Sequence, residues 1–124
     1  MHVAKGDEGL NLVEFSVKGF PPAYDSGNSI LNKNHKRYPL VVKLQNATRD
    51  AMNGKFLDGV LSLELYCEAT QEHDSTDTAN LVGGTTNSLE GIVYLNDNQI
   101  KEIHCKRILS NQDKYTVRIA KVGH

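Results

Sequence analysis

Residues 61–68 alternate between apolar and polar side chains within a strand predicted over residues 60–69, and this alternation constrains the fold more than any other feature of the chain. Leu61, Leu63, Leu65 and Cys67 occupy every second position, and the positions between them carry Ser, Glu or Tyr. A period of two residues is typical of a strand that buries one face. The segment therefore predicts a half-buried strand.

The remaining segments supply an element order for the whole domain. Three more strands are predicted, over residues 12–18, 100–109 and 115–120, and two helices, over residues 40–52 and 78–89. The order is strand, helix, strand, helix, strand, strand. We expect an α+β two-layer sandwich, with a four-stranded sheet and both helices on one face. A chain of 124 residues suits a single domain over residues 1–124, with residues 1–9 flexible.

Proline and glycine mark the predicted helices. Pro39 suits the first turn of the first helix, and Gly54 is a plausible stop. In the second helix, Gly83 and Gly84 are adjacent, although each costs about 1 kcal/mol relative to alanine. Such a pair indicates a close backbone approach, either to the sheet or to a partner.

Composition excludes several classes of protein. The chain is 39% hydrophobic and 23% charged, and it has no apolar run long enough to span a membrane. Its polar beginning does not resemble a secretory signal, so we expect a cytoplasmic protein. Cys67 and Cys105 lie within predicted strands, where they are expected to be small apolar groups rather than a disulfide.

Charge is distributed unevenly, although the net charge is only −1. Residues 33–55 carry six bases and one acid, residues 56–100 carry eight acids and no Lys or Arg, and residues 101–124 carry six bases and two acids. This pattern suits a metal-dependent enzyme acting on a polyanion, or basic and acidic faces that neutralise each other. The candidate phosphate-binding residues are Lys33, Lys36, Arg37, Lys43 and Arg49.

Two aspartates bracket the acidic centre, and each has two interpretations. Asp77 can cap the second helix, and Asp97 can simply occupy a turn before the third strand. Alternatively, the helix start and the strand entrance meet in space, and the two carboxylates form a site for a hard cation. The second interpretation predicts that the carboxylates lie within roughly 6 Å of each other.

Three short motifs resemble one known family. They are FPP at residues 20–22, DTANL at 77–81 and YLNDNQI at 94–100. Their order and spacing resemble the RusA-type Holliday-junction resolvases, from about residue 12 to 122. The resemblance implies a RusA-like fold, a homodimer and cleavage of branched DNA with Mg²⁺.

The resemblance also assigns roles to individual residues. Asp77 matches the first acid of the helix motif, and Asp97 matches the second acid of the turn pair; both are implied catalytic residues and metal ligands. Ala79 and Asn96 stand where the family has its other two acids. The family's lysine falls near Gly83, and Asp74 is a candidate replacement metal ligand.

These departures leave the function open between three classes. The first is a Mg²⁺-dependent endonuclease with an incomplete set of carboxylates. The second is a nucleic-acid-binding relative without catalysis, which would show salt-dependent binding. The third is a protein-interaction domain that keeps the fold, with the helix of Gly83 and Gly84 as its dimer surface.

Overall fold

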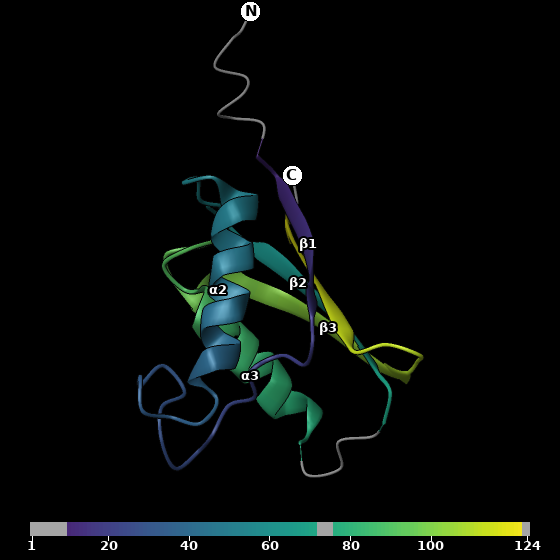
Figure 1. Cartoon of the computed structure of the whole chain (residues 1–124). Coiled ribbons are helices and arrows are strands. Elements are labelled where there is room, and N and C mark those ends of the chain that lie inside the picture. Colours follow the sequence, from purple (N-terminus) through teal and green to yellow (C-terminus); the bar gives the residue numbers. More distant parts are fainter. Residues whose placement is uncertain (1–9, 72–75, 123–124) are drawn as a thin grey trace, which may run out of the picture.

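The computed structural model describes residues 10–71 and 76–122, which form a layer of strands packed against a layer of helices (Figure 1). The order of elements is the predicted one and confirms the α+β fold. The elements are β1 (Leu12–Lys18), α2 (Tyr38–Met52), β2 (Leu61–Ala69), α3 (Thr78–Leu89), the short 3-10 helix η1 (Asp97–Gln99), β3 (Ile100–Leu109) and β4 (Lys114–Lys121).

The sheet has the strand order β1-β4-β2-β3. β4 is antiparallel to both of its neighbours, whereas β2 and β3 are parallel, with Leu61 beside Ile100 and Ala69 beside Leu109. Between two parallel strands the chain must return from the end of the first to the start of the second. α3 lies in this return connection. The residues before α3 and the residues before β3 therefore lie at opposite ends of the sheet.

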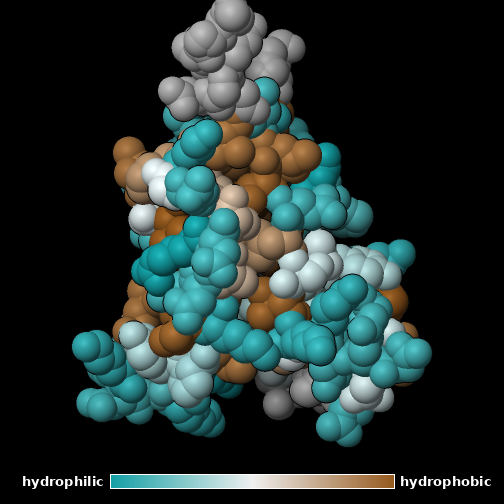
Figure 2. Space-filling view, turned by 45° about the horizontal axis from the view of Figure 1, so that its top comes forward, coloured by the Kyte–Doolittle hydropathy of each residue, from teal (hydrophilic) through white to brown (hydrophobic). Residues whose placement is uncertain are grey.

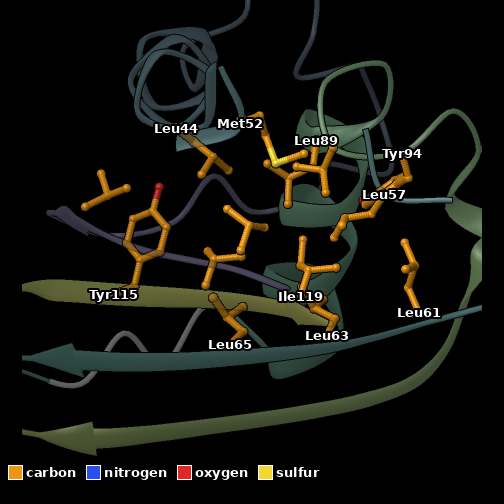
Figure 3. Close-up of a cluster of buried hydrophobic side chains, with 14 of the residues drawn as sticks. Leu44, Met52, Leu57, Leu61, Leu63, Leu65, Leu89, Tyr94, Tyr115 and Ile119 are labelled. Atoms are coloured by element: carbon orange, nitrogen blue, oxygen red, sulfur yellow. The ribbon is translucent and has the colours of Figure 1, made fainter. Parts of the chain in front are cut away.

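The core lies between the sheet and the two helices (Figure 3). Leu61, Leu63 and Leu65 of β2 are at most 1% exposed, as the alternating pattern predicts. They pack in one cluster with Leu44 of α2 and Leu89 of α3. Burying each such side chain contributes about 1.5–3 kcal/mol. The position of β2 inside the sheet, with a neighbour on each side, explains why its alternation is the clearest.

α2 is slightly longer than the sequence predicts. It begins at Tyr38, and Pro39 lies in its first turn. The helix ends at Met52, as predicted. Its C-cap is Asn53, with a left-handed φ of 52°, and the predicted stop Gly54 follows directly with a φ of 80°. Asn is the residue after Gly that most readily adopts this conformation. Among the described residues, no helix combines the length and the apolar character needed to cross a membrane.

α3 is fixed at its start by Asp77 and in its middle by a glycine. The Asp77 carboxylate accepts a hydrogen bond from the Asn80 N–H at 2.7 Å, which confirms its predicted role as a cap. Gly84 is buried against the backbone of Pro22, and the Tyr24 N–H donates to the Asn80 carbonyl at 2.7 Å. The close approach predicted for the glycine pair is confirmed at Gly84 only, and it is made to residues 22–24 of the same chain rather than to the sheet.

Candidate functional site

Asp77 lies at the end of the sheet where β2 and β3 finish. Its side chain is exposed at the start of α3. Together with Phe20, Ala69 and Arg107 it lines a cavity of about 360 Å³. Arg107 of β3 donates from its guanidinium to the Thr76 carbonyl at 3.0 Å and reaches the Thr78 hydroxyl at 3.4 Å. This arginine links the start of α3 to β3, and no local pattern in the sequence predicts that contact.

Asp97 lies at the other end of the sheet, in η1, directly before β3. Its backbone N–H donates to the Glu90 carboxylate at 2.9 Å. Both acids lie near Tyr94, whose pKa is raised by burial first and then by the negative charges of Asp97 and Glu90. The Tyr94 hydroxyl donates to the Thr86 carbonyl at 2.7 Å. Sequence analysis did not predict that Glu90 contacts Asp97. Its position seven residues before Asp97, directly after a predicted helix, was the only indication.

Asn96, which stands where the resemblance implies an acid, has a structural role of its own. Its side chain accepts a hydrogen bond from the Asn98 N–H at 2.8 Å and caps η1. Gln99 completes this capping box by accepting from the Asn96 N–H at 3.1 Å. The Gln99 amide also donates to the carbonyls of Leu57 and Gly59 at 3.2 and 3.1 Å. The turn is therefore well ordered by amide side chains.

The prediction that Asp77 and Asp97 converge is wrong within one chain. Asp77 follows the C-terminal end of β2, whereas Asp97 precedes the N-terminal end of β3, which pairs with the start of β2. The paired length of these strands is nine residues, or about 30 Å. The parallel connection through α3 separates the two aspartates, because it carries the chain back along the whole sheet.

A metal site of three or more ligands is absent from residues 10–71 and 76–122 of a single chain. Asp74, the third predicted ligand, lies outside the described residues. The two remaining acids are separated by the sheet. One chain, as far as the structure describes it, does not fit a magnesium ion held jointly by Asp77 and Asp97.

The predicted phosphate-binding residues fall into two groups. Lys33 and Lys36 are exposed in the loop before α2, which lies at the lower left of Figure 1. Lys43 is also exposed, on α2, and its ammonium lies beside Gly19 at the end of β1. Figure 2 shows mainly hydrophilic residues at this lower left corner. Arg49 is apart from them, in the last turn of α2.

Arg37 differs from the lysines of its loop because its guanidinium is engaged. It donates to the Ala23 carbonyl at 3.1 Å and to the Tyr24 carbonyl at 3.2 Å. These bonds hold the segment that packs on Gly84. In Figure 1 the loop that carries Lys33 and Lys36 and the start of α3 both lie toward the bottom, the loop at the left and the start of α3 at the right.

The same loop contains a hydrogen-bonded pair that sequence analysis missed. His35 Nε2 lies 2.7 Å from the Asp25 carboxylate, and His35 Nδ1 accepts from the Arg37 N–H at 2.9 Å. The hydrogen bond from His35 is the main reason that the pKa of Asp25 is below its ordinary value, and a second bond from the Gly27 N–H adds to it. Since Nδ1 is an acceptor, Nε2 is the nitrogen that donates to the Asp25 carboxylate. The pair orders the loop that presents Lys33 and Lys36.

Comparison with known proteins gives one result for this chain. The family model of endodeoxyribonuclease RusA matches residues 22–120. This range includes both aspartates, all the predicted phosphate-binding residues and every element except β1. No curated protein matched the chain.

Proposed function

The chain belongs to the RusA endodeoxyribonuclease family, and from this premise we propose that it binds branched DNA and nicks it as a pair of identical chains. One observation supports the proposal that two identical chains act together. Asp77 and Asp97 of one chain are separated by the length of the sheet. If both carboxylates serve one phosphodiester, they must come from two copies. If a two-fold axis relates two copies so that their sheets lie side by side and antiparallel, Asp97 of one copy lies near Asp77 of the other.

The binding part of the proposal rests on Lys33, Lys36 and Lys43. Their side chains are exposed, and the loop that carries the first two lies toward the bottom of Figure 1, as the start of α3 does. Lysine contacts to phosphate oxygens position a duplex without reading its sequence, which suits a protein that recognises DNA shape. Arg49 contributes from the opposite end of α2, where the partner's Asp77 lies in the proposed pair.

We propose that magnesium is bound only by two chains together, because the described residues of one chain contain no cluster of ligands. When bound, the ion would neutralise charge on the phosphate. The chain's own contribution is to hold the DNA backbone and to fix two carboxylates. The role of Asp74 as a metal ligand stays a prediction.

A complementation experiment tests this function. The Asp77→Asn and Asp97→Asn variants are assayed for nicking of a four-way DNA junction, separately and after being unfolded and refolded together. Asn caps helices as well as Asp, so Asp77→Asn keeps the fold. We expect each variant alone to be inactive and the mixture to recover about a quarter of the original activity, because half of the dimers contain one intact site of two.

One variant serves as the control, and two results would contradict the proposal. Asp50→Asn, on the exposed surface of α2, should leave nicking unchanged. A wild-type chain that nicks no branched substrate ends the nuclease proposal. A mixture that stays inactive while the wild type cuts shows that the two aspartates do not serve one shared site.

Binding without cleavage is the alternative function, and two contacts favour it. The Asp77 carboxylate is occupied as a helix cap, and Asn96 caps η1 where the family has an acid. This alternative predicts junction binding that weakens as salt rises from roughly 50 to 200 mM, with no nicking by the wild type. The same junction assay distinguishes the two functions.

A further inference from the structure

The two cysteines of the chain lie next to each other on neighbouring strands. Cys67 is on β2 and Cys105 is on β3, and the sequence contains no other cysteine. In the parallel register Cys105 is level with Leu65, so Cys67 is its diagonal neighbour, two positions further along β2. Both side chains lie on the helix side of the sheet, where Leu65 and Cys67 are buried. The two thiols share a hydrogen bond.

The two thiols differ in their access to solvent. Cys67 is 2% exposed and belongs to the core between the sheet and the helices. Cys105 is half-buried, and its neighbours on the same face of β3, Ile103 and Leu109, are 52% and 64% exposed. The helices therefore leave this part of β3 uncovered. A small oxidant can reach Cys105 from solvent, whereas Cys67 is almost closed off from it.

Arg107 lies beside the pair and favours the ionised form of Cys105. It is level with Cys67 in the register of β2 and β3, and it follows Cys105 by two positions on the same face of β3. The hydrogen bond from Cys67, and then the positive charge of Arg107, lower the pKa of Cys105 to about 7. The thiolate is the form of cysteine that attacks oxidants, so Cys105 is the thiol that reacts first.

We propose that Cys105 and Cys67 form a reversible oxidation site, at which a hydroperoxide such as hydrogen peroxide is reduced and a disulfide forms between β2 and β3. The Cys105 thiolate attacks one peroxide oxygen, the O–O bond breaks and hydroxide leaves, so that Cys105 becomes a sulfenic acid. The Cys67 thiol then attacks this sulfur. The S–S bond forms, the S–O bond breaks, and the oxygen leaves as water with the proton of Cys67.

Formation of the disulfide requires a local movement of β3. The S–S bond is about 2.0 Å long, so the two sulfur atoms must come closer than they are in a hydrogen bond. β3 is an outer strand of the sheet, and among the described residues it pairs only with β2. A strand with one neighbour shifts more easily than a strand held on both sides, so Cys105 can approach Cys67 while the core stays closed.

Peroxide treatment followed by mass spectrometry tests the site without DNA or added metal, so the result does not depend on the proposed function. The wild type is treated with hydrogen peroxide at neutral pH, and the remaining thiols are then alkylated. We expect the mass of the chain to fall by that of two hydrogen atoms and the free thiols to fall from two to none. Digestion should give one linked pair of peptides, containing Cys67 and Cys105. Dithiothreitol should restore both thiols.

Two matched variants separate the two steps of the reaction. In Cys67→Ala the second thiol is missing, so Cys105 should stop as a sulfenic acid, which dimedone traps as an adduct. In Cys105→Ala the thiol that reacts first is missing, so Cys67 should stay reduced under the same treatment. Circular dichroism shows whether each variant is folded, and the wild-type measurement decides the disulfide by itself if one of them is not.

Three results with the wild type would overturn the proposal. Two free thiols could persist under peroxide, Cys105 could gain oxygen while Cys67 stays free, or the disulfide could link two chains, which a non-reducing gel shows as a doubled mass. Oxidation of Cys67 in Cys105→Ala at the rate seen in the wild type would also overturn it, because Cys105 would then not be the thiol that reacts first.

Discussion

Gly84 of α3 lies directly on the backbone of Pro22. A β-carbon at this position would lie 2.7 Å from the Pro22 carbonyl carbon and 2.8 Å from the Tyr24 nitrogen, both of which are backbone atoms. We expect Gly84→Ala to lower the free energy of unfolding by about 1–3 kcal/mol, because overpacking outweighs the helix propensity that alanine adds. Urea unfolding measures the change.

The adjacent glycine provides the matched control. At Gly83 a β-carbon would meet only the Tyr24 side chain, at 3.4 Å, which is ordinary contact. Gly83→Ala should therefore be neutral or raise the free energy of unfolding by up to about 1 kcal/mol. Equal effects of the two substitutions would contradict the close approach at Gly84.

Cys105 is predicted to react as a thiolate near neutral pH. A hydrogen bond from the Cys67 thiol, helped by the positive charge of Arg107, lowers the pKa of Cys105 from 9.0 to about 7. The same bond and burial raise the pKa of Cys67. We expect the rate of Cys105 alkylation by iodoacetamide to rise with a midpoint near pH 7, while Cys67 reacts slowly. Mass spectrometry of the labelled peptides separates the two sites.

Replacing Cys67 tests whether its hydrogen bond lowers the pKa of Cys105. Cys67→Ala removes the hydrogen bond, so the midpoint for Cys105 should move toward its ordinary value near 9.0. An unchanged midpoint would show that the bond has no influence.

The Asp25–His35 pair predicts an acid limit for the loop before α2. The pKa of Asp25 is lower in the folded protein than its ordinary value of 3.8, so the unfolded chain binds the proton more readily. The stability from this carboxylate is thus complete above pH 3.8 and is lost as pH falls through the folded value. In urea unfolding, Asp25→Asn should be less stable than the wild type above pH 4, and the difference should shrink at lower pH. A constant difference would show that the hydrogen bond from His35 does not lower the pKa of Asp25.

The elements of this fold were largely predictable, because hydrophobic alternation and helix signals are local. Asp77 was recognised as a cap for the same reason. The relation between Asp77 and Asp97 was not predictable in this way, since it depends on β2 and β3 being parallel. Nothing local distinguishes a parallel pair from an antiparallel one. The partners of Arg107 and His35 likewise come from residues distant in the sequence, so their roles appeared only in the folded chain.

Lys36 and Arg37 are neighbours with different expected effects on DNA binding. Lys36 is exposed, so Lys36→Gln should weaken junction binding and reduce the slope of log affinity against log salt by about 0.9, the value of one duplex phosphate contact. The free energy of unfolding of Lys36→Gln should equal that of the wild type. Arg37 donates to Ala23 and Tyr24, so Arg37→Gln should lower the free energy of unfolding by about 1–3 kcal/mol.

Fluorescence anisotropy with a labelled junction at several salt concentrations gives the slope, and urea unfolding gives the stability. The two variants remove the same charge from adjacent positions, so electrostatics at long range changes equally in both. If Lys36→Gln leaves the slope unchanged, this lysine does not contact phosphate. Loss of stability in Lys36→Gln, or none in Arg37→Gln, would contradict the division of roles, since only the guanidinium bridges to the segment that carries Pro22 and Tyr24.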